Sequence, residues 1–211
     1  MFCTRIRILI LGCISSELRG LCNEKLLPLG DFSKTDDMFK TYKKFKNGGK
    51  VLIHTNIDRT LTDFKYLLTI ANIFAKEGKR VELMPAIHFK SDIYKKIYGS
   101  LIGTIYERKC PDLKIGNIFY EFENFDPPFR KRKIANMISH GTKQSSRIII
   151  NNNKGASDRF ILRNIRERMM DKNFKYEIDE VWLYEKGNLR LLFKNTVGSP
   201  PPLQAHVPQH S

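Results

Sequence analysis

The chain has 211 residues, 41% hydrophobic and 28% charged, which is enough to bury a substantial core. Lysine and arginine number 37 against 22 aspartate and glutamate, a formal net charge of +15. This excess favours a polyanionic partner, because basic side chains on phosphates release condensed counterions. A protein with an incidentally basic surface is the alternative. An anionic membrane is a third, although no basic amphipathic helix stands out.

The cysteine pattern and the N-terminal segment bear on the compartment. Cys3, Cys13, Cys22 and Cys110 include no C-x-x-C pair, so neither a disulfide framework nor a zinc ribbon is indicated and a cytoplasmic location is expected. The apolar run 8–11 is too short for a signal-peptide core and for a membrane span, so no transmembrane segment is expected. A lipoprotein-like cleavage before Cys13 is the alternative.

Composition divides the chain into three parts. Residues 1–37 are expected to be a poorly structured extension, because Met38 is a natural start for a folded domain. One domain is expected over residues 38–197. Residues 198–211 include three consecutive prolines and are expected to be a disordered tail, since such a segment cannot build a core.

Hydrophobic periodicity predicts an alternation of strands and helices within the domain. Thr62 is expected to cap the first helix and Ser157 a later one. Gly48-Gly49 lies in a basic turn, and no phosphate-loop pattern follows it. The expected helices cover 62–75, 91–101, 130–144 and 157–170, and the expected strands cover 51–54, 80–84, 147–151, 178–184 and 189–194.

Residues 110–124 predict a tight hairpin around Gly116-Asn117. In this register Asp112 lies opposite Glu121, with Cβ atoms about 5 Å apart, and Glu123 shares their face. Because like charges directly opposite are destabilising, a metal cation, a lysine or an arginine is expected to relieve them. The remaining expected pairs are Leu113 with Tyr120, Lys114 with Phe119 and Ile115 with Ile118.

Two helices combine a buried stripe with clustered basic residues. The helix 130–144 opens with four basic residues that oppose the helix macrodipole, which favours a role in phosphate binding; a solvated basic turn is the alternative. The helix 91–101 interleaves tyrosines with lysines, which suits bases and phosphates or a solvated surface. The first helix presents Arg130, Lys131, Arg132 and Lys133, a stripe of Ile134, Met137, Ile138 and Gly141, and then Lys143 and Gln144; the second presents Tyr94, Lys95, Lys96 and Tyr98.

The order of these elements indicates an α/β layered domain with a central mixed sheet flanked by helices. A helix, three strands, a helix and a fourth strand also form the core of the PD-(D/E)XK nucleases, so the chain resembles a restriction-endonuclease-like fold. In that superfamily Pro-Asp opens the second core strand and an acidic-x-Lys tripeptide lies on the third. Pro111-Asp112 and Glu121-Phe122-Glu123 occupy those places here.

A narrower resemblance covers residues 50–194. Ala-Lys-Glu-Gly, Val-Glu-Leu-Met-Pro, Pro-Asp, the acidic strand, Lys143-Gln144-Ser145 and Arg-Ile-Ile-Ile follow one another. This ordered set is similar to the CdiA-type toxin nuclease domains of contact-dependent growth inhibition and to their relatives in polymorphic-toxin and mobile-element proteins. The resemblance implies an endonuclease on nucleic acid without fixing its substrate, since members of the group cleave tRNA or DNA. RNA, with tRNA as the best single guess, is expected before DNA, and a cognate inhibitor protein is a further expected partner.

The resemblance also implies a divalent metal and a set of site residues. Asp112 and Glu121 are hard-oxygen ligands suited to Mg²⁺, with Mn²⁺ and Zn²⁺ as alternatives, and Asp63 on the first helix is a third ligand. Such an ion neutralises charge on the phosphate and makes water nucleophilic. The implied catalytic residues are Asp112, Glu121, Glu123, Lys143 and Gln144, and the implied nucleic-acid-binding residues are Arg130, Lys131, Arg132, Lys133 and Lys143.

The chain departs from the family pattern at Glu123, where the family has a lysine that helps to orient water or stabilise developing charge. Glu123 is then an extra ligand, or Lys133 or Lys143 has taken over the role, or catalysis is lost. A structural ion pair between Glu123 and the basic helix is a further reading. Loss of catalysis corresponds to an inactive nucleic-acid-binding module of the same fold, and acidic residues engaged by arginines correspond to a structural or interaction protein whose charge is incidental.

A metal-independent RNase is the other catalytic alternative. It would use His140 as a general acid or base, together with Lys143 or Arg147. His54, His88 and His140 are dispersed and accompany no serine or cysteine nucleophile motif, so a catalytic triad is not indicated.

Overall fold

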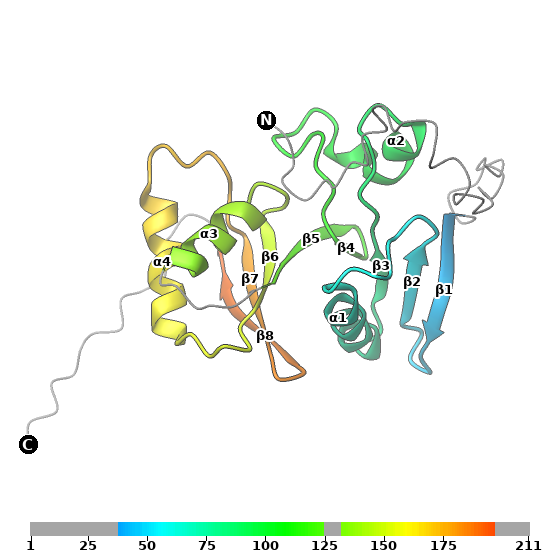
Figure 1. Ribbon diagram of the computed structural model, residues 1–211, viewed down its shortest axis with the longest axis horizontal. Coiled ribbons are helices and arrows are strands. Elements are labelled where there is room, and N and C mark those ends of the chain that lie inside the picture. The colour runs from blue at the N-terminus through cyan, green and yellow to red at the C-terminus, as the bar shows by residue number, and fades with distance from the viewer. Residues whose placement is uncertain (1–37, 125–131, 197–211) are drawn as a thin grey trace, which may run out of the picture.

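The computed structural model describes residues 38–124 and 132–196. Its framework is an eight-stranded mixed sheet in which the strands neighbour one another in chain order, from β1 to β8 (Figure 1). The α/β class and the mixed sheet are confirmed. The strands are β1 (Phe39–Lys44), β2 (Lys50–His54), β3 (Arg80–Leu83), β4 (Leu113–Ile115), β5 (Ile118–Glu123), β6 (Arg147–Asn151), β7 (Glu180–Glu185) and β8 (Asn188–Lys194). The helices are α1 (Phe64–Lys76), α2 (Asp92–Tyr98), α3 (Arg132–Gly141) and α4 (Asp158–Met170), with the 3-10 turn η2 (Gly99–Leu101).

Strand direction decides which residues meet at one edge of the sheet. β2 is parallel to β3, β4 is antiparallel to both β3 and β5, and β5, β6 and β7 are parallel. β2, β3, β5, β6 and β7 therefore all end at the same edge, and antiparallel β4 begins there. Asp112 before β4, Asn124 after β5 and Asn151 at the end of β6 thus lie along this carboxyl edge, where ligands of open α/β sheets commonly bind.

The helices divide between the two faces of the sheet. The core cluster under α1 includes Leu67 and Ile70 of the helix together with Leu113 and Phe122 of the sheet. The opposite face carries two separate clusters, one with α2 and one with α3 and α4. Alternation along β5 shows the division, since Phe122 belongs to the α1 cluster and Phe119 to the α2 cluster.

Most expected elements are present, and three differences are informative. Ser91 and Ser157 cap α2 and α4 by accepting hydrogen bonds from backbone N–H groups, at 3.2 and 3.4 Å. The prediction of Thr62 as the cap of α1 is wrong, because Asp63 holds that position and its side chain makes no capping bond. The strand β1 was not predicted. The helix expected over 130–144 spans Arg132–Gly141 in the described part of the chain.

Several predictions fall outside the described residues. These are the extension 1–37, the tail 198–211, Arg130 and Lys131, and the first three cysteines. The fourth, Cys110, is half-buried, and its thiol donates a hydrogen bond to the carbonyl oxygen of Ile87 at 3.2 Å. Within the described ranges, no helix has the length and apolar character needed to cross a membrane.

His54 ends β2 as a buried imidazole with 1% of its surface exposed. Its Nδ1 accepts a hydrogen bond from the Asn56 N–H at 3.0 Å, and its ring meets the Phe39 ring edge to face at 4.9 Å. Burial disfavours the imidazolium and lowers the pKa of His54 to about 4. The neutral ring is therefore part of the folded structure.

The free energy of unfolding should fall as the pH is lowered from about 6.5 to about 4, since the unfolded imidazole gains a proton first. At about 1.4 kcal/mol for each pKa unit, His54 contributes roughly 2–3 kcal/mol to this fall. Urea unfolding across this pH range measures it. His54→Gln keeps an acceptor for Asn56 and should flatten the pH dependence. The exposed His88 offers a control, and equal profiles for His54→Gln and His88→Gln would contradict the prediction.

Candidate active site

The hairpin β4–β5 has the predicted register. Leu113 pairs with Tyr120, Lys114 with Phe119 and Ile115 with Ile118. Gly116 has φ +60°, a left-handed conformation that suits glycine in a tight two-residue turn. The next position on each strand holds Asp112 and Glu121.

Asp112 is fixed between β3 and β5. Its carbonyl oxygen accepts a hydrogen bond from the Met84 N–H at 2.9 Å, and its carboxylate Oδ2 accepts one from the Phe122 N–H at 3.0 Å. The side chain thus satisfies a backbone donor of β5 where the regular ladder has ended. A carboxylate offers about four lone-pair sites, so this bond does not exhaust its capacity as a ligand.

Glu121 and Glu123 lie on the face of β5 opposite to Phe122. They pair in register with Ile148 and Ile150 of β6, which belong to the cluster under α3 and α4. Only 6% of Glu121 and 8% of Glu123 are exposed. Carboxylates are rarely this buried unless they are paired or bind a cation. We call Asp112, Glu121 and Glu123 the carboxylate site.

Tyr98 of α2 connects the carboxylate site to the insertion between β3 and β4. It is fully buried, and its hydroxyl lies 2.8 Å from the Pro85 carbonyl oxygen and 3.2 Å from that of Pro111. Burial raises the pKa of Tyr98 well above its usual value, and the charges of Cys110, Asp112 and Glu121 raise it further. The hairpin register, extended by one residue, places Asp112 opposite Glu121, and the Tyr98 hydroxyl contacts the residue just before Asp112.

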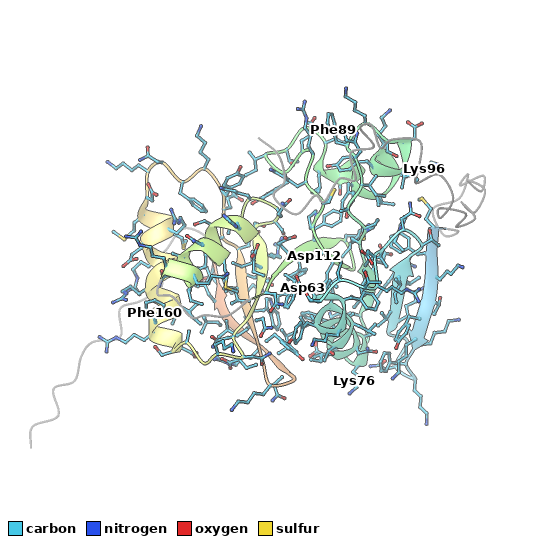
Figure 2. The ribbon with its side chains drawn as sticks, viewed as in Figure 1. Asp63, Lys76, Phe89, Lys96, Asp112 and Phe160 are labelled. Atoms are coloured by element: carbon cyan, nitrogen blue, oxygen red, sulfur yellow. The ribbon has the colours of Figure 1, made fainter. Side chains whose placement is uncertain are left out.

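Asp63 reaches the carboxyl edge from the opposite face of the sheet. Its Oδ1 accepts a hydrogen bond from the Asn124 side-chain amide at 2.5 Å, and Asn124 Oδ1 accepts one from the Asn151 amide at 2.8 Å. This chain ties the start of α1 to the ends of β5 and β6. Figure 2 shows Asp63 and Asp112 toward the middle of the molecule.

The three predicted metal ligands do not form a ready cage. Within residues 38–124 and 132–196, no three His, Cys, Asp or Glu side chains gather in a way that could hold a metal ion. Asp63 instead binds the Asn124 amide. Mg²⁺ commonly takes one or two carboxylates and completes its shell with water and substrate phosphate. Asp112 and Glu121 could supply these two carboxylates, because they occupy facing positions of the β4–β5 hairpin.

The helix α3 packs against β5 and β6, next to Glu123 of the carboxylate site. Its buried residues Ile134, Met137, Ile138 and Gly141 are those predicted. Arg132 and Lys143 are exposed, and Lys133 and Gln144 are half-buried. After Gln144, the Ser145 hydroxyl donates to the Phe119 carbonyl oxygen at 2.8 Å, which anchors this segment beside β5.

Gly141 marks the closest approach of α3 to the sheet. A Cβ atom there would lie 2.8 Å from Ile148 Cγ2 and 3.1 Å from Glu123 Cγ. Gly141→Ala should therefore lower the free energy of unfolding by roughly 1–2 kcal/mol, since overpacking outweighs the gain in helix propensity at the last helical residue. Chemical denaturation measures this. Ser139→Ala on the same helix is the control, and a Gly141→Ala protein as stable as wild type would contradict the close approach.

Of the two predicted partners of His140, Arg147 lies in other surroundings. His140 is exposed near the end of α3. Arg147 Nη2 is 3.2 Å from Asp179 Oδ2, and its Nε lies 3.8 Å from Glu180 Oε1. Arg147 thus serves ion pairs at the amino ends of β6 and β7, which does not favour it as a catalytic group.

Three residues of this region were not predicted from the sequence. Asn124 and Asn151 follow apolar strands, and that position at a carboxyl edge was an available signal. Tyr98 and its neighbour Tyr94 were read as a stacking or solvated surface, and that reading is wrong, because both are at most 1% exposed. No protein-family model, curated protein or solved structure matches the chain. Its function therefore has to be inferred from this geometry and from its charge.

Proposed function

We propose that this protein is a metal-dependent endonuclease of the PD-(D/E)XK type, acting on RNA and most specifically on tRNA. The observation that carries the proposal is the position of Asp112 and Glu121. They lie at facing positions of the β4–β5 hairpin, where Glu121 is buried and Asp112 is half-buried, in a chain with a formal charge of +15. A largely shielded acidic pair in a strongly basic protein suits a cation and a phosphate together.

The arrangement of the elements supports this proposal. The helix α1, the meander β3–β4–β5, the helix α3 and the strand β6 occur in the order that the superfamily resemblance requires. The clusters place α1 on one face of the sheet and α3 on the other. Pro111-Asp112 then precedes the second strand of this set, and Glu121 lies on the third.

In this mechanism Asp112 and Glu121 hold the divalent ion, Mg²⁺ first, with Mn²⁺ and Zn²⁺ as alternatives. When bound, the ion neutralises charge on the phosphate and activates a water molecule. The backbone N–H of Phe122 orients the Asp112 carboxylate through its 3.0 Å hydrogen bond. Arg132 and Lys143, which are exposed at the two ends of the α3 segment, bind phosphates of the strand in this proposal.

The role of the family's lysine passes in this proposal to a lysine of the α3 segment. Glu123 is buried against Gly141, so the strand position itself offers no cation. Lys133 is half-buried in the first turn of α3, and Lys143 is exposed just beyond its end. Comparing the cleavage rates of Lys133→Met and Lys143→Met separates these two candidates.

A non-catalytic nucleic-acid-binding module is the second candidate. Glu123 in the lysine position and the lack of a three-ligand group among the described residues favour it. Such a module would bind nucleic acid with a steep salt dependence and without turnover.

Incubation of the purified protein with total RNA and with plasmid DNA tests the proposal. Each substrate is incubated with Mg²⁺, Mn²⁺ or Zn²⁺ and with EDTA. Cleavage of RNA that needs the metal and stops in EDTA supports a metal-dependent endonuclease. Cleavage that persists in EDTA would instead support a metal-independent RNase, and binding without cleavage would support the non-catalytic module.

A further inference from the structure

The insertion between β3 and β4, residues 85–110, presents a basic and aromatic surface that the carboxylate site does not use. It contains five lysine or arginine residues against two acidic ones. Tyr94 and Tyr98 attach it to the sheet, and each hydroxyl hydrogen-bonds to a carbonyl oxygen of the insertion or its flanks. In Figure 1, α2 and its loops form the upper part of the molecule.

Phe89 lies at the centre of a group of cations in this insertion. The Arg108 guanidinium carbon is 4.6 Å from the ring centroid, and Lys90 Nζ is 5.9 Å from it. The His88 ring lies 4.9 Å away, tilted by 34°. Elsewhere in the described residues, each ring in a cation–π contact faces a single cation, as Phe160 faces Arg163.

Arg108 is held in an unusual backbone conformation with its side chain outward. Its φ is +67°, which costs a non-glycine residue about 1 kcal/mol or more and is commonest where function requires it. The side chain is 64% exposed, and its contact with Glu107 is long, at 3.8 Å. The Tyr94 hydroxyl donates to the next carbonyl, that of Lys109, at 3.0 Å, which fixes the loop.

This surface lies close to the carboxylate site along the chain. Arg108 precedes Asp112 by four residues, so their Cα atoms are at most about 14 Å apart. The Tyr98 hydroxyl joins the two ends of the insertion, because it contacts the carbonyl oxygens of Pro85 at 2.8 Å and of Pro111 at 3.2 Å. Figure 2 shows Phe89 in the upper part of the molecule and Asp112 below it, toward the middle.

We propose that Phe89 and Arg108 form a stacking site for one unpaired base of a nucleic-acid strand that runs past the carboxylate site. This inference rests on the proposed function for its ligand. Bases stack on aromatic rings and on guanidinium planes, and a splayed single strand offers such a face, whereas a base inside a duplex has both faces covered. The surrounding lysines bind the phosphates on either side.

Equilibrium binding in EDTA tests the site without requiring cleavage. The probes are a single-stranded RNA, a single-stranded DNA and a duplex of the same sequence, each also prepared with 2-aminopurine. The variants are Phe89→Leu and Arg108→Gln. The matched controls are Phe160→Leu and Arg163→Gln, because Arg163 is 62% exposed, lies 5.2 Å over Phe160 and contacts Glu167 at 3.8 Å. Figure 2 shows Phe160 on the opposite side of the molecule.

Phe89→Leu should weaken single-strand binding by about fivefold to 100-fold, while leaving its salt dependence unchanged, since the lost contact is a stacked base and carries no charge. Arg108→Gln should weaken it and also reduce the salt slope by about 0.7. Quenching of 2-aminopurine should be lost in both variants, and duplex binding should be unchanged. Comparison of RNA with DNA shows which strand the site prefers.

Losses no larger than those of the Phe160 and Arg163 controls would overturn the stacking site, and so would equal losses for single strand and duplex. Absence of single-strand binding by the wild-type protein would overturn it too. Base stacking in a protein that never cleaves with metal would support the site while refuting the endonuclease. The two failures are therefore distinguishable.

Discussion

Replacing Asp112 by asparagine should lower metal-dependent cleavage by at least about 100-fold, because a metal ligand contributes several kcal/mol to the transition state. Glu121→Gln should have a similar effect. Both substitutions keep the size of the side chain and remove the negative charge. Initial rates of RNA cleavage in Mg²⁺, measured on proteins of known folded fraction, test this expectation.

The choice of asparagine at Asp112 follows from the structure. The carboxylate Oδ2 accepts the Phe122 N–H, and alanine would leave that donor without its acceptor at a cost of roughly 1–3 kcal/mol. A loss of activity in Asp112→Ala would then mix unfolding with lost chemistry. Asparagine retains a carbonyl oxygen for the bond, so its thermal unfolding should stay close to that of wild type.

Asp92 provides a matched control for the charge change. Its side chain is 87% exposed in the first turn of α2, and it pairs only at the surface with Lys95. Asp92→Asn should leave cleavage and stability unchanged, because exposed pairs contribute little. Full activity in both Asp112→Asn and Glu121→Gln would refute the carboxylate site as a catalytic centre.

Much of the fold could be predicted because its strands and helices have one buried face. The stripe of α3 and the register of β4–β5 follow from hydrophobic spacing, and both are confirmed. β1 could not be found in this way. Its sequence, Phe-Lys-Thr-Tyr-Lys-Lys, is exposed after the first residue, as edge strands often are, so it carries no alternating apolar signal.

The candidate site was predictable in its acidic residues and not in its supports. Asp112 and Glu121 follow from the hairpin register alone. The position of Tyr98 could not be predicted, because its hydroxyl contacts the backbone carbonyl oxygens of Pro85 and Pro111. No pattern of side chains in the sequence encodes such contacts. Asp63 was expected on the first helix as a third metal ligand, but at the N-cap of α1 its side chain accepts a hydrogen bond from the Asn124 amide, which no local pattern predicts.

Gly48 and Gly49 were predicted to form a turn, and the structure shows a different reason for glycine at each position. Gly48 has φ +85° and open space around the position of a Cβ atom. At Gly49 a Cβ atom would lie 1.9 Å from the Ala75 carbonyl oxygen, at the end of α1. The absence of a side chain at Gly49 therefore lets the β1–β2 turn touch α1. Asn47 contacts the same helix, because its side-chain amide donates a hydrogen bond to the Lys76 carbonyl oxygen.

Gly49→Ala should accordingly lower the free energy of unfolding by more than about 4 kcal/mol, because the clash is with backbone and α1 must shift. The melting temperature should fall by about 10 °C or more at this chain length. Gly48→Ala should cost only about 1–2 kcal/mol, the strain of a left-handed alanine. Thermal and urea unfolding of the two variants measure the difference.

The comparison of these neighbours isolates packing from backbone strain, since both substitutions add one methyl group. Equal stabilities would show that the turn does not rest on α1. The order Gly49→Ala far below Gly48→Ala would show that it does. In that case Gly49 serves the packing of the β1–β2 turn against α1, and a phosphate-binding role for this turn is not required.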